Sequence, residues 1–388
     1  MYDFDKLTNR LGTGSLKWDV NEGQLPMWVA DMDFETAPEI IQALQKRIEH
    51  GVFGYQNVTD DWYQAYQSWW NRRHQFKIER DWLIFCTGVV PAISSIVRKV
   101  TTVGENVLVQ TPVYNIFFNS IRNNGRNILE SPLIYEQGEY HIDFKDLEEK
   151  LSNPQTSLFI LCNPHNPIGK IWDRETLEKI GELCDRYHVI VVSDEIHCDL
   201  TDPGYEYVPF ASVSDQCREN SITCIAPTKT FGIPGIQTAA VVVPNPVLRH
   251  RVNRGLNTDE VAEPNNFAVA AAVAAFQHGD QWLTELREYL SQNKQYVRDY
   301  IGAYIPEIKV VPSNATYLLW LDCSELTDDA CELQRFIEKH SGLVLTEGEE
   351  YGTPGRRFLR LNPACPRSRV QDGMERLKNS VNAYKNLK

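Results

Sequence analysis

Three short apolar runs, each followed by polar residues, constrain the fold of this chain more than any other feature. The runs are 157–161, 189–193 and 221–226. Asn163 and Asn166 follow the first run, Asp194 follows the second, and Lys229 follows the third. Short apolar runs bounded by turn formers are typical of buried parallel strands, whose carboxyl ends meet at one edge of a sheet where ligands bind. The pattern predicts an α/β fold with an amide, a carboxylate and an amine at one edge.

An amide, a carboxylate and an amine are the groups that a pyridoxal phosphate (PLP) site needs. The amide can hydrogen-bond the phenolic oxygen of the cofactor, Asp194 can keep its pyridine nitrogen protonated, and Lys229 can carry its aldehyde carbon as a Schiff base. A lone lysine is usually a solvated surface charge, so the prediction of a cofactor site rests on the strands that precede Lys229. With these residues the sequence resembles the fold-type I PLP enzymes, and within them the MalY/PatB-type cystathionine β-lyases, or C–S lyases.

The resemblance extends over nearly the whole chain. The matching segments are 27–33, 88–92, 163–167, 194–197 and 358–367. It implies a large domain with a mostly parallel central sheet covered by helices, and a smaller α+β domain built from both termini. We place the large, PLP-binding domain at 41–280 and the small domain, with an N-terminal arm, at 1–40 and 281–388.

Composition and charge restrict the classes of partner. The chain has 388 residues and a net charge of −13, which argues against a nucleic-acid surface. Nine dispersed cysteines without a Cys-x-x-Cys pair predict neither a disulfide framework nor a zinc site, and His197 with Cys198 and Asp199 lacks ligand spacing. We expect no metal, no membrane segment and a cytoplasmic location.

The phosphate of the cofactor is expected at a glycine turn that opens a helix. Gly88 precedes this predicted helix, and the backbone amides of Val89 and Val90 are free to bind an anion there. The family resemblance adds the hydroxyl of Thr228 and, from the other subunit of a homodimer, Tyr55. It also implies that an aromatic ring stacks on the pyridine and that a histidine and a further amide lie close to the cofactor. These residues are Tyr114, His197 and Asn163.

The substrate is expected to be an amino acid. A fixed guanidinium binds a carboxylate bidentately, and Arg360 matches the substrate arginine of the family. In the resembled lyases an N-terminal arm crosses the substrate entrance, which implicates Ala30, and Tyr55 and Asn166 are further substrate-binding candidates. Lys229, Asp194 and Tyr114 are the catalytic candidates.

Three classes of function stay open. The first is a C–S β-lyase that cleaves L-cystathionine, L-cysteine or other S-substituted cysteines to homocysteine, hydrogen sulfide or another thiol, with pyruvate and ammonia. The second is a PLP-dependent aminotransferase, which would use the same residues. The third is a PLP-fold regulatory protein without catalysis.

The sequence departs from the family pattern at three positions near Lys229. Many fold-type I enzymes have a phosphate-binding serine and arginine where this chain has Ala226 and Gln237. Gly232 stands where the lyase pattern has asparagine. We therefore expect weaker retention of the cofactor.

Periodicity predicts the other elements. A helix begins at Ala37–Pro38 with Ile40, Ile41 and Ile48 among its apolar residues, and Gly51 follows its end. Residues 60–70, 143–151, 267–276, 281–304 and 331–340 are further predicted helices, 106–110 and 238–243 are predicted strands, and 121–138 is interpreted as a crossover with a turn.

Overall fold

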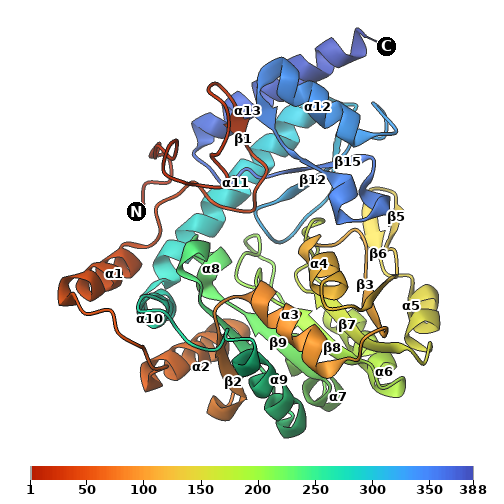
Figure 1. Cartoon of the computed structure of the whole chain (residues 1–388). Coiled ribbons are helices and arrows are strands. Elements are labelled where there is room, and N and C mark those ends of the chain that lie inside the picture. Colours follow the sequence, from red (N-terminus) through yellow and green to blue (C-terminus); the bar gives the residue numbers. More distant parts are fainter. Residues whose placement is uncertain (1, 388) are drawn as a thin grey trace.

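A seven-stranded sheet forms the centre of the computed structural model, which describes residues 2–387 (Figure 1). From edge to edge its strands are β2 (Leu83–Cys86), β10 (Ala239–Val242), β9 (Ser221–Ile225), β8 (Ile190–Asp194), β7 (Thr156–Cys162), β3 (Asn106–Val109) and β4 (Asn127–Glu130). Strand β10 runs antiparallel to both of its neighbours, and the pairs from β9 to β4 are parallel. The predicted α/β class with a mostly parallel sheet is confirmed.

Helices cover both faces of this sheet because successive strand side chains point to opposite sides. Leu158 and Ile160 of β7 lie in one core with helices α3 (Val89–Val100), α4 (Ile116–Arg122) and α9 (Pro246–Thr258). Phe159 and Leu161 of β7 lie in the core formed with α5 (Phe144–Leu151), α6 (Arg174–Arg186) and α7 (Asp215–Glu219). The aromatic helix α2 (Asp60–His74) and the alanine-rich α10 (Ala268–His278) pack near the β2 edge, and α1 (Pro38–His50) lies on α10.

A second, antiparallel sheet is built from the C-terminal part of the chain. Its order is β11 (Lys309–Val310), β12 (Leu319–Asp322), β15 (Phe358–Leu361) and β14 (Thr346–Glu347). Helices α12 (Ala330–Ser341) and α13 (Arg367–Lys385) pack with it, and β1 (Leu25–Pro26) pairs with β13 (Leu343–Val344). A separate hairpin joins β5 (Ile134–Glu136) to β6 (Glu139–His141). The N-terminal arm thus joins the C-terminal unit, as Figure 1 shows.

Helix α11 (Asp280–Tyr304) connects the two units. Its first half contributes Leu283 and Leu286 to the core near β2, and its second half contributes Val297 and Ile301 to the core under the second sheet. The predicted domain boundary at residue 280 coincides with the start of this shared helix and stays a prediction.

Two sequence expectations are corrected. The segment 121–138 is not only a crossover, because it contains β4, which pairs in parallel with β3 at the edge of the sheet. In α1 Ile40 is buried, but Ile41 and Ile48 are exposed, because the helix meets its neighbours along one narrow face. Periodicity alone did not distinguish a core-facing stripe from an exposed apolar one.

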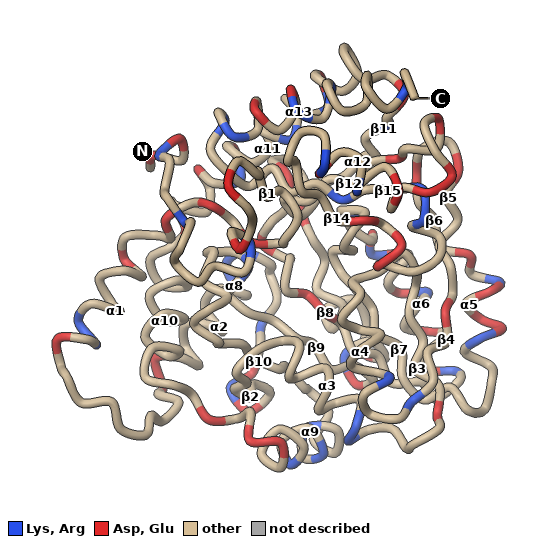
Figure 2. The backbone as a smooth tube through the Cα atoms, turned by 45° about the horizontal axis from the view of Figure 1, so that its top comes forward, with Lys and Arg blue, Asp and Glu red and all other residues tan. Residues whose placement is uncertain are grey.

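Charged residues of both signs are interspersed over the tube in Figure 2. All nine cysteines are free thiols, and eight of them are buried. None of the helices within residues 2–387 combines the length and apolar character needed to span a membrane.

Candidate active site

The three predicted strand ends meet at one cavity. Strands β7, β8 and β9 are adjacent and parallel, and their register places Cys162 beside Asp194 and Asp194 beside Cys224. Lys229 lies in α8 (Pro227–Thr230), directly after β9. The cavity has a volume of about 300 Å³. The predicted site residues that line it are Ala30, Gly88, Val89, Val90, Tyr114, Asn166, Asp194, His197, Thr228 and Lys229.

Asp194 provides a buried carboxylate at the floor of this cavity. Its Oδ1 accepts a hydrogen bond from the backbone N–H of Ile196 at 3.1 Å. Burial raises the pKa of Asp194 to about 7, against the lowering effects of that hydrogen bond and of Lys229. A carboxylate held in this way gains from a cationic partner inside the cavity, such as a protonated ring nitrogen.

Lys229 provides the amine. Its Nζ donates to the carbonyl oxygen of Ala30 at 2.6 Å, which ties α8 to the N-terminal arm. Burial lowers the pKa of Lys229 to about 8; Asp31 and Asp194 raise it and Arg360 lowers it further. About one tenth of the side chain is therefore free amine at pH 7, far more than for an ordinary lysine, and a nucleophile or base requires this unprotonated form.

Arg360 lies on β15 and is 5% exposed. It is not among the residues that line the cavity, but it contacts Asn166, which is. Its Nη1 donates to Asn166 Oδ1 at 3.3 Å, and its Nη2 donates to the carbonyl oxygen of Trp28 at 3.0 Å. The guanidinium also lies over the ring of Tyr351, 4.9 Å from its centroid. The buried Nε has no partner among the described residues. This free donor gives Arg360 capacity for one more acceptor, such as a substrate carboxylate.

The start of α3 forms part of the cavity wall. Gly88 is the N-cap, and no side chain caps the helix, so the first backbone N–H groups have no intrahelical acceptor. A Cβ at Gly88 would lie 3.2 Å from Cδ of Pro91, which makes a larger residue tight at this turn. Together with the Thr228 hydroxyl, these groups suit a phosphate.

Tyr114 and His197 also line the cavity. Burial raises the pKa of Tyr114 to about 12, with Asp194 adding to the shift, so its hydroxyl stays protonated. Burial lowers the pKa of His197 to about 3, helped by Lys229 and Arg360, so its ring is neutral. The buried Nδ1 of His197 has no partner among the described residues and can bond a polar group that enters the cavity.

Two predicted cofactor residues are not among those that line the cavity. The Asn163 amide donates to the carbonyl oxygen of Val208 at 3.0 Å, and its buried Oδ1 has no partner among residues 2–387. Tyr55 is fully exposed on the loop after α1. Within one chain it therefore contributes nothing to the site.

The three departures from the family pattern have clear positions. Gln237 lines the cavity, and Ala226 is buried at the end of β9. Gly232 has a φ of 64°, a left-handed conformation that glycine and asparagine both adopt readily. The turn after α8 thus has a backbone shape that either residue satisfies.

Sequence reasoning missed Tyr317, whose hydroxyl donates to the Ala30 carbonyl oxygen at 2.9 Å. It stands just before β12 without any motif around it. No sequence signal indicates that it meets an arm residue 287 positions away.

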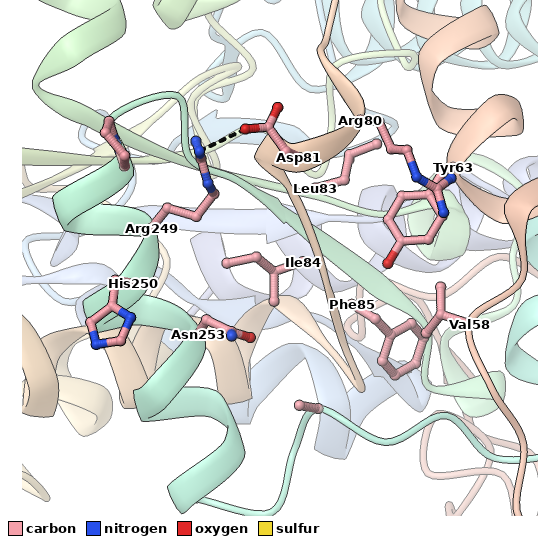
Figure 3. A pocket seen from close by; sticks show the side chains of 12 residues that line it. Val58, Tyr63, Arg80, Asp81, Leu83, Ile84, Phe85, Arg249, His250 and Asn253 are labelled. Atoms are coloured by element: carbon pink, nitrogen blue, oxygen red, sulfur yellow. Dashed lines mark hydrogen bonds and ion pairs between the residues drawn. The ribbon is translucent and has the colours of Figure 1, made fainter.

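Other polar clusters are less suited to a ligand. A cavity of about 600 Å³ lies along β2 and α9 (Figure 3), where Arg249 pairs with Asp81 at 2.7 Å and Arg80 covers the ring of Tyr63. His74, Cys198 and Asp199 also lie together. The Asp199 carboxylate already accepts hydrogen bonds from Trp69, His74 and Thr230, which occupies both of its oxygens.

The residues of the first cavity fit PLP. A buried carboxylate, a lysine amine and a helix N-terminus with free amides line the same cavity. The buried Nδ1 of His197, which nothing within residues 2–387 satisfies, adds a polar contact for such a ligand.

Comparison with known proteins gives full-length matches. The chain matches the family "Aminotransferase class I and II" over residues 22–377. It is 43% identical to cystathionine beta-lyase PatB of Bacillus subtilis (strain 168), over 97% of this chain and 99% of that protein. It is 34% identical to Protein MalY of Escherichia coli (strain K12), over 99% and 100%. The crystal structure of cystalysin from Treponema denticola, which contains a PLP cofactor, superposes with a TM-score of 0.96 at 34% identity and covers 100% of both chains.

Proposed function

The chain belongs to the class I and II aminotransferase family, and within this family we propose that it is a PLP-dependent C–S β-lyase. The fold-type I architecture, the resemblance to the MalY/PatB group and the PLP cofactor predicted from the sequence are confirmed. The observation that carries the proposal is the 43% identity with a cystathionine β-lyase over 97% of the chain. The lyase function is thereby favoured over an aminotransferase and over an inactive regulatory protein.

We propose that each side chain of the cavity has one task toward the cofactor. The Asp194 carboxylate holds the pyridine nitrogen, and the amides of Val89 and Val90 with the Thr228 hydroxyl hold the phosphate. Tyr114 packs against the ring, and Asn166 and His197 contact its polar edge. Bound PLP supplies an electron sink that stabilises negative charge at the substrate Cα.

We propose that the chain positions the substrate through its carboxylate. Arg360 and Asn166, which already contact each other, bind the carboxylate of the amino acid and direct its Cα toward Lys229. The Lys229 amine, with a pKa of about 8, removes the Cα proton. Loss of the β-substituent as a thiolate then leaves pyruvate and ammonia after hydrolysis. The arm from Trp28 to Ala30 covers this point and limits the access of water.

The substrates proposed are L-cystathionine, L-cysteine and other S-substituted cysteines, which share the same amino-acid half. Arg360, which contacts the lining residue Asn166, binds only the carboxylate of that half, so substrates with different sulfur substituents share the same anchor. Homocysteine or hydrogen sulfide is the thiol released.

The active form proposed is a homodimer. Tyr55 is fully exposed, and the apolar side chains of Ile48, Val52 and Phe53 beside it are more than half exposed. A second copy that covers this surface would bring Tyr55 to the phosphate of its neighbour. A cytoplasmic location is part of the same proposal, since all nine cysteines are free thiols.

The test is an incubation of the PLP-loaded protein with L-cystathionine and no keto acid. The lyase releases pyruvate and free thiol in equal amounts, and Lys229→Ala abolishes both. Conversion that requires a keto acid and yields no thiol would identify an aminotransferase instead.

A further inference from the structure

The carbonyl oxygen of Ala30 is a shared acceptor at the mouth of the cavity. It accepts the Lys229 amine at 2.6 Å and the Tyr317 hydroxyl at 2.9 Å. A carbonyl oxygen has two lone pairs, so it can accept both donors at once. The position of the amine therefore depends on where the arm holds this oxygen.

Tyr317 is fixed from its own side. It is 1% exposed, and its ring lies edge-on to His197, with centroids 6.2 Å apart. The preceding residue, Thr316, has a φ of 62°, which is rare and strained for a β-branched side chain. Such a backbone persists only where its surroundings impose it.

The surroundings of Thr316 do so through a buried ion pair. The Thr316 N–H donates to the carbonyl oxygen of Leu200 at 2.6 Å. Lys294 of α11 donates to the Thr316 carbonyl oxygen at 3.3 Å and to both oxygens of Asp202 at 2.7 and 2.8 Å. Loops from both structural units thus meet at Thr316 and direct the Tyr317 hydroxyl toward the arm.

We propose that Tyr317 is a positioning residue, whose hydroxyl fixes the Ala30 carbonyl oxygen and through it the free amine of Lys229. This rests on the proposed function insofar as that amine moves the Cα proton. With the hydroxyl absent, the arm loses one of its ties to the C-terminal unit and the amine loses a fixed acceptor. Substrate binding through Arg360 does not involve this hydroxyl.

The test is the variant Tyr317→Phe, which removes the hydroxyl and keeps the ring. One neutral hydrogen bond corresponds to a factor of about 2 to 10, so kcat is expected to fall by about that factor while KM stays unchanged. In the apoprotein, the amine of Lys229 is expected to react about 2 to 10 times faster with an amine-directed reagent, measured by mass spectrometry of the labelled peptide.

Tyr140→Phe is the matched control. Tyr140 is buried in another core, and its hydroxyl accepts a hydrogen bond from Trp320 Nε1 at 3.1 Å. Because each variant removes one buried hydroxyl, Tyr140→Phe is expected to lose about as much thermal stability as Tyr317→Phe. Its kcat and the labelling of Lys229 are expected to stay unchanged.

Unchanged kcat and labelling in Tyr317→Phe would overturn the proposal. So would a loss of thermal stability, PLP affinity and kcat together with unaltered labelling, which would indicate a structural role only. The labelling needs no cofactor or substrate, so its result is independent of whether the protein is a lyase.

Discussion

Two neighbouring carboxylates show how local surroundings divide roles at the scale of single residues. Burial raises the pKa of both Asp194 and Glu195 to about 7. Glu195 accepts hydrogen bonds from Ser193, Tyr207 and the Phe210 N–H, so its oxygens are fully used inside the protein. Asp194 accepts one backbone bond and faces the cavity. Glu195 therefore fixes the loop after β8, and Asp194 is left for a ligand.

The buried amine of Lys229 is expected to reduce the stability of the apoprotein. Its pKa of about 8 in the folded state is below the value of about 10.4 in an unfolded chain. The unfolded state binds more protons between these values, so stability rises with pH across this window. Lys229→Met is expected to stabilise the apoprotein at pH 7 by about 3 kcal/mol, and this gain disappears above about pH 10.4.

Denaturant unfolding of both apoproteins at pH 7 and pH 10.5 measures this difference. Lys145→Met, at an exposed site on α5, is the control and is expected to change stability little at either pH. A Lys229→Met protein that is less stable than the parent at pH 7 would contradict the claim that the buried amine of Lys229 destabilises the apoprotein.

At the scale of elements, the N-terminal arm is held by a buried charge cluster. Asp33 is 2% exposed and contacts Lys17 Nζ at 3.1 Å, Trp18 Nε1 at 2.9 Å and Arg10 Nη1 at 2.8 Å. Burial alone would raise the pKa of Asp33, but the charge of Lys17 and these hydrogen bonds hold it below its usual value. The cluster fixes the segment whose carbonyls meet Lys229 and Arg360.

Asp33→Asn is expected to destabilise the protein by about 3 kcal/mol, because it leaves the buried Lys17 without its counter-charge. The free energy of unfolding in urea measures this loss. The stability difference is largest above about pH 4 and decreases at lower pH, where the Asp33 carboxyl of the parent becomes protonated. Asp60→Asn breaks the exposed pair with Arg80 and is expected to cost less than about 1 kcal/mol. Equal effects of the two substitutions would refute a special role for the cluster.

Elements with strong local signals were predictable, and those defined by distant contacts were not. The apolar runs at 157–161 and 189–193 predicted β7 and β8, and the predicted helix at 143–151 corresponds to α5, which Asp143 caps by accepting backbone N–H groups. Strand β4 was missed because its residues are only half buried at the sheet edge.

The site was predictable to the extent that its residues follow strands. Asp194, Lys229 and Asn166 were predicted because each follows an apolar run, and all three line the candidate cavity. The hydrogen bonds of Ala30 with Lys229 and Tyr317 were not, because they join segments 199 and 287 positions apart that only the folded chain brings together.

At the scale of the whole molecule, the exposed apolar surface around α1 predicts a dimer. Light scattering is expected to give twice the mass of one chain for the parent protein. Ile48→Glu is expected to shift the protein toward single chains and to weaken PLP binding, since Tyr55 then no longer reaches a neighbour. Val103→Glu, at an exposed position in the turn between α3 and β3, near the opposite edge of the sheet, should change neither. A parent protein of single-chain mass would contradict the proposed assembly.

Locating the cofactor on the chain is the most direct test of the proposed active site. Borohydride treatment of the PLP-loaded protein fixes the cofactor covalently to the lysine that carries it, and peptide mass spectrometry identifies that residue. A single modified peptide that contains Lys229 is expected, and no such peptide from Lys229→Ala. Modification of a different lysine, or of none, would contradict the assignment of this cavity as the active site.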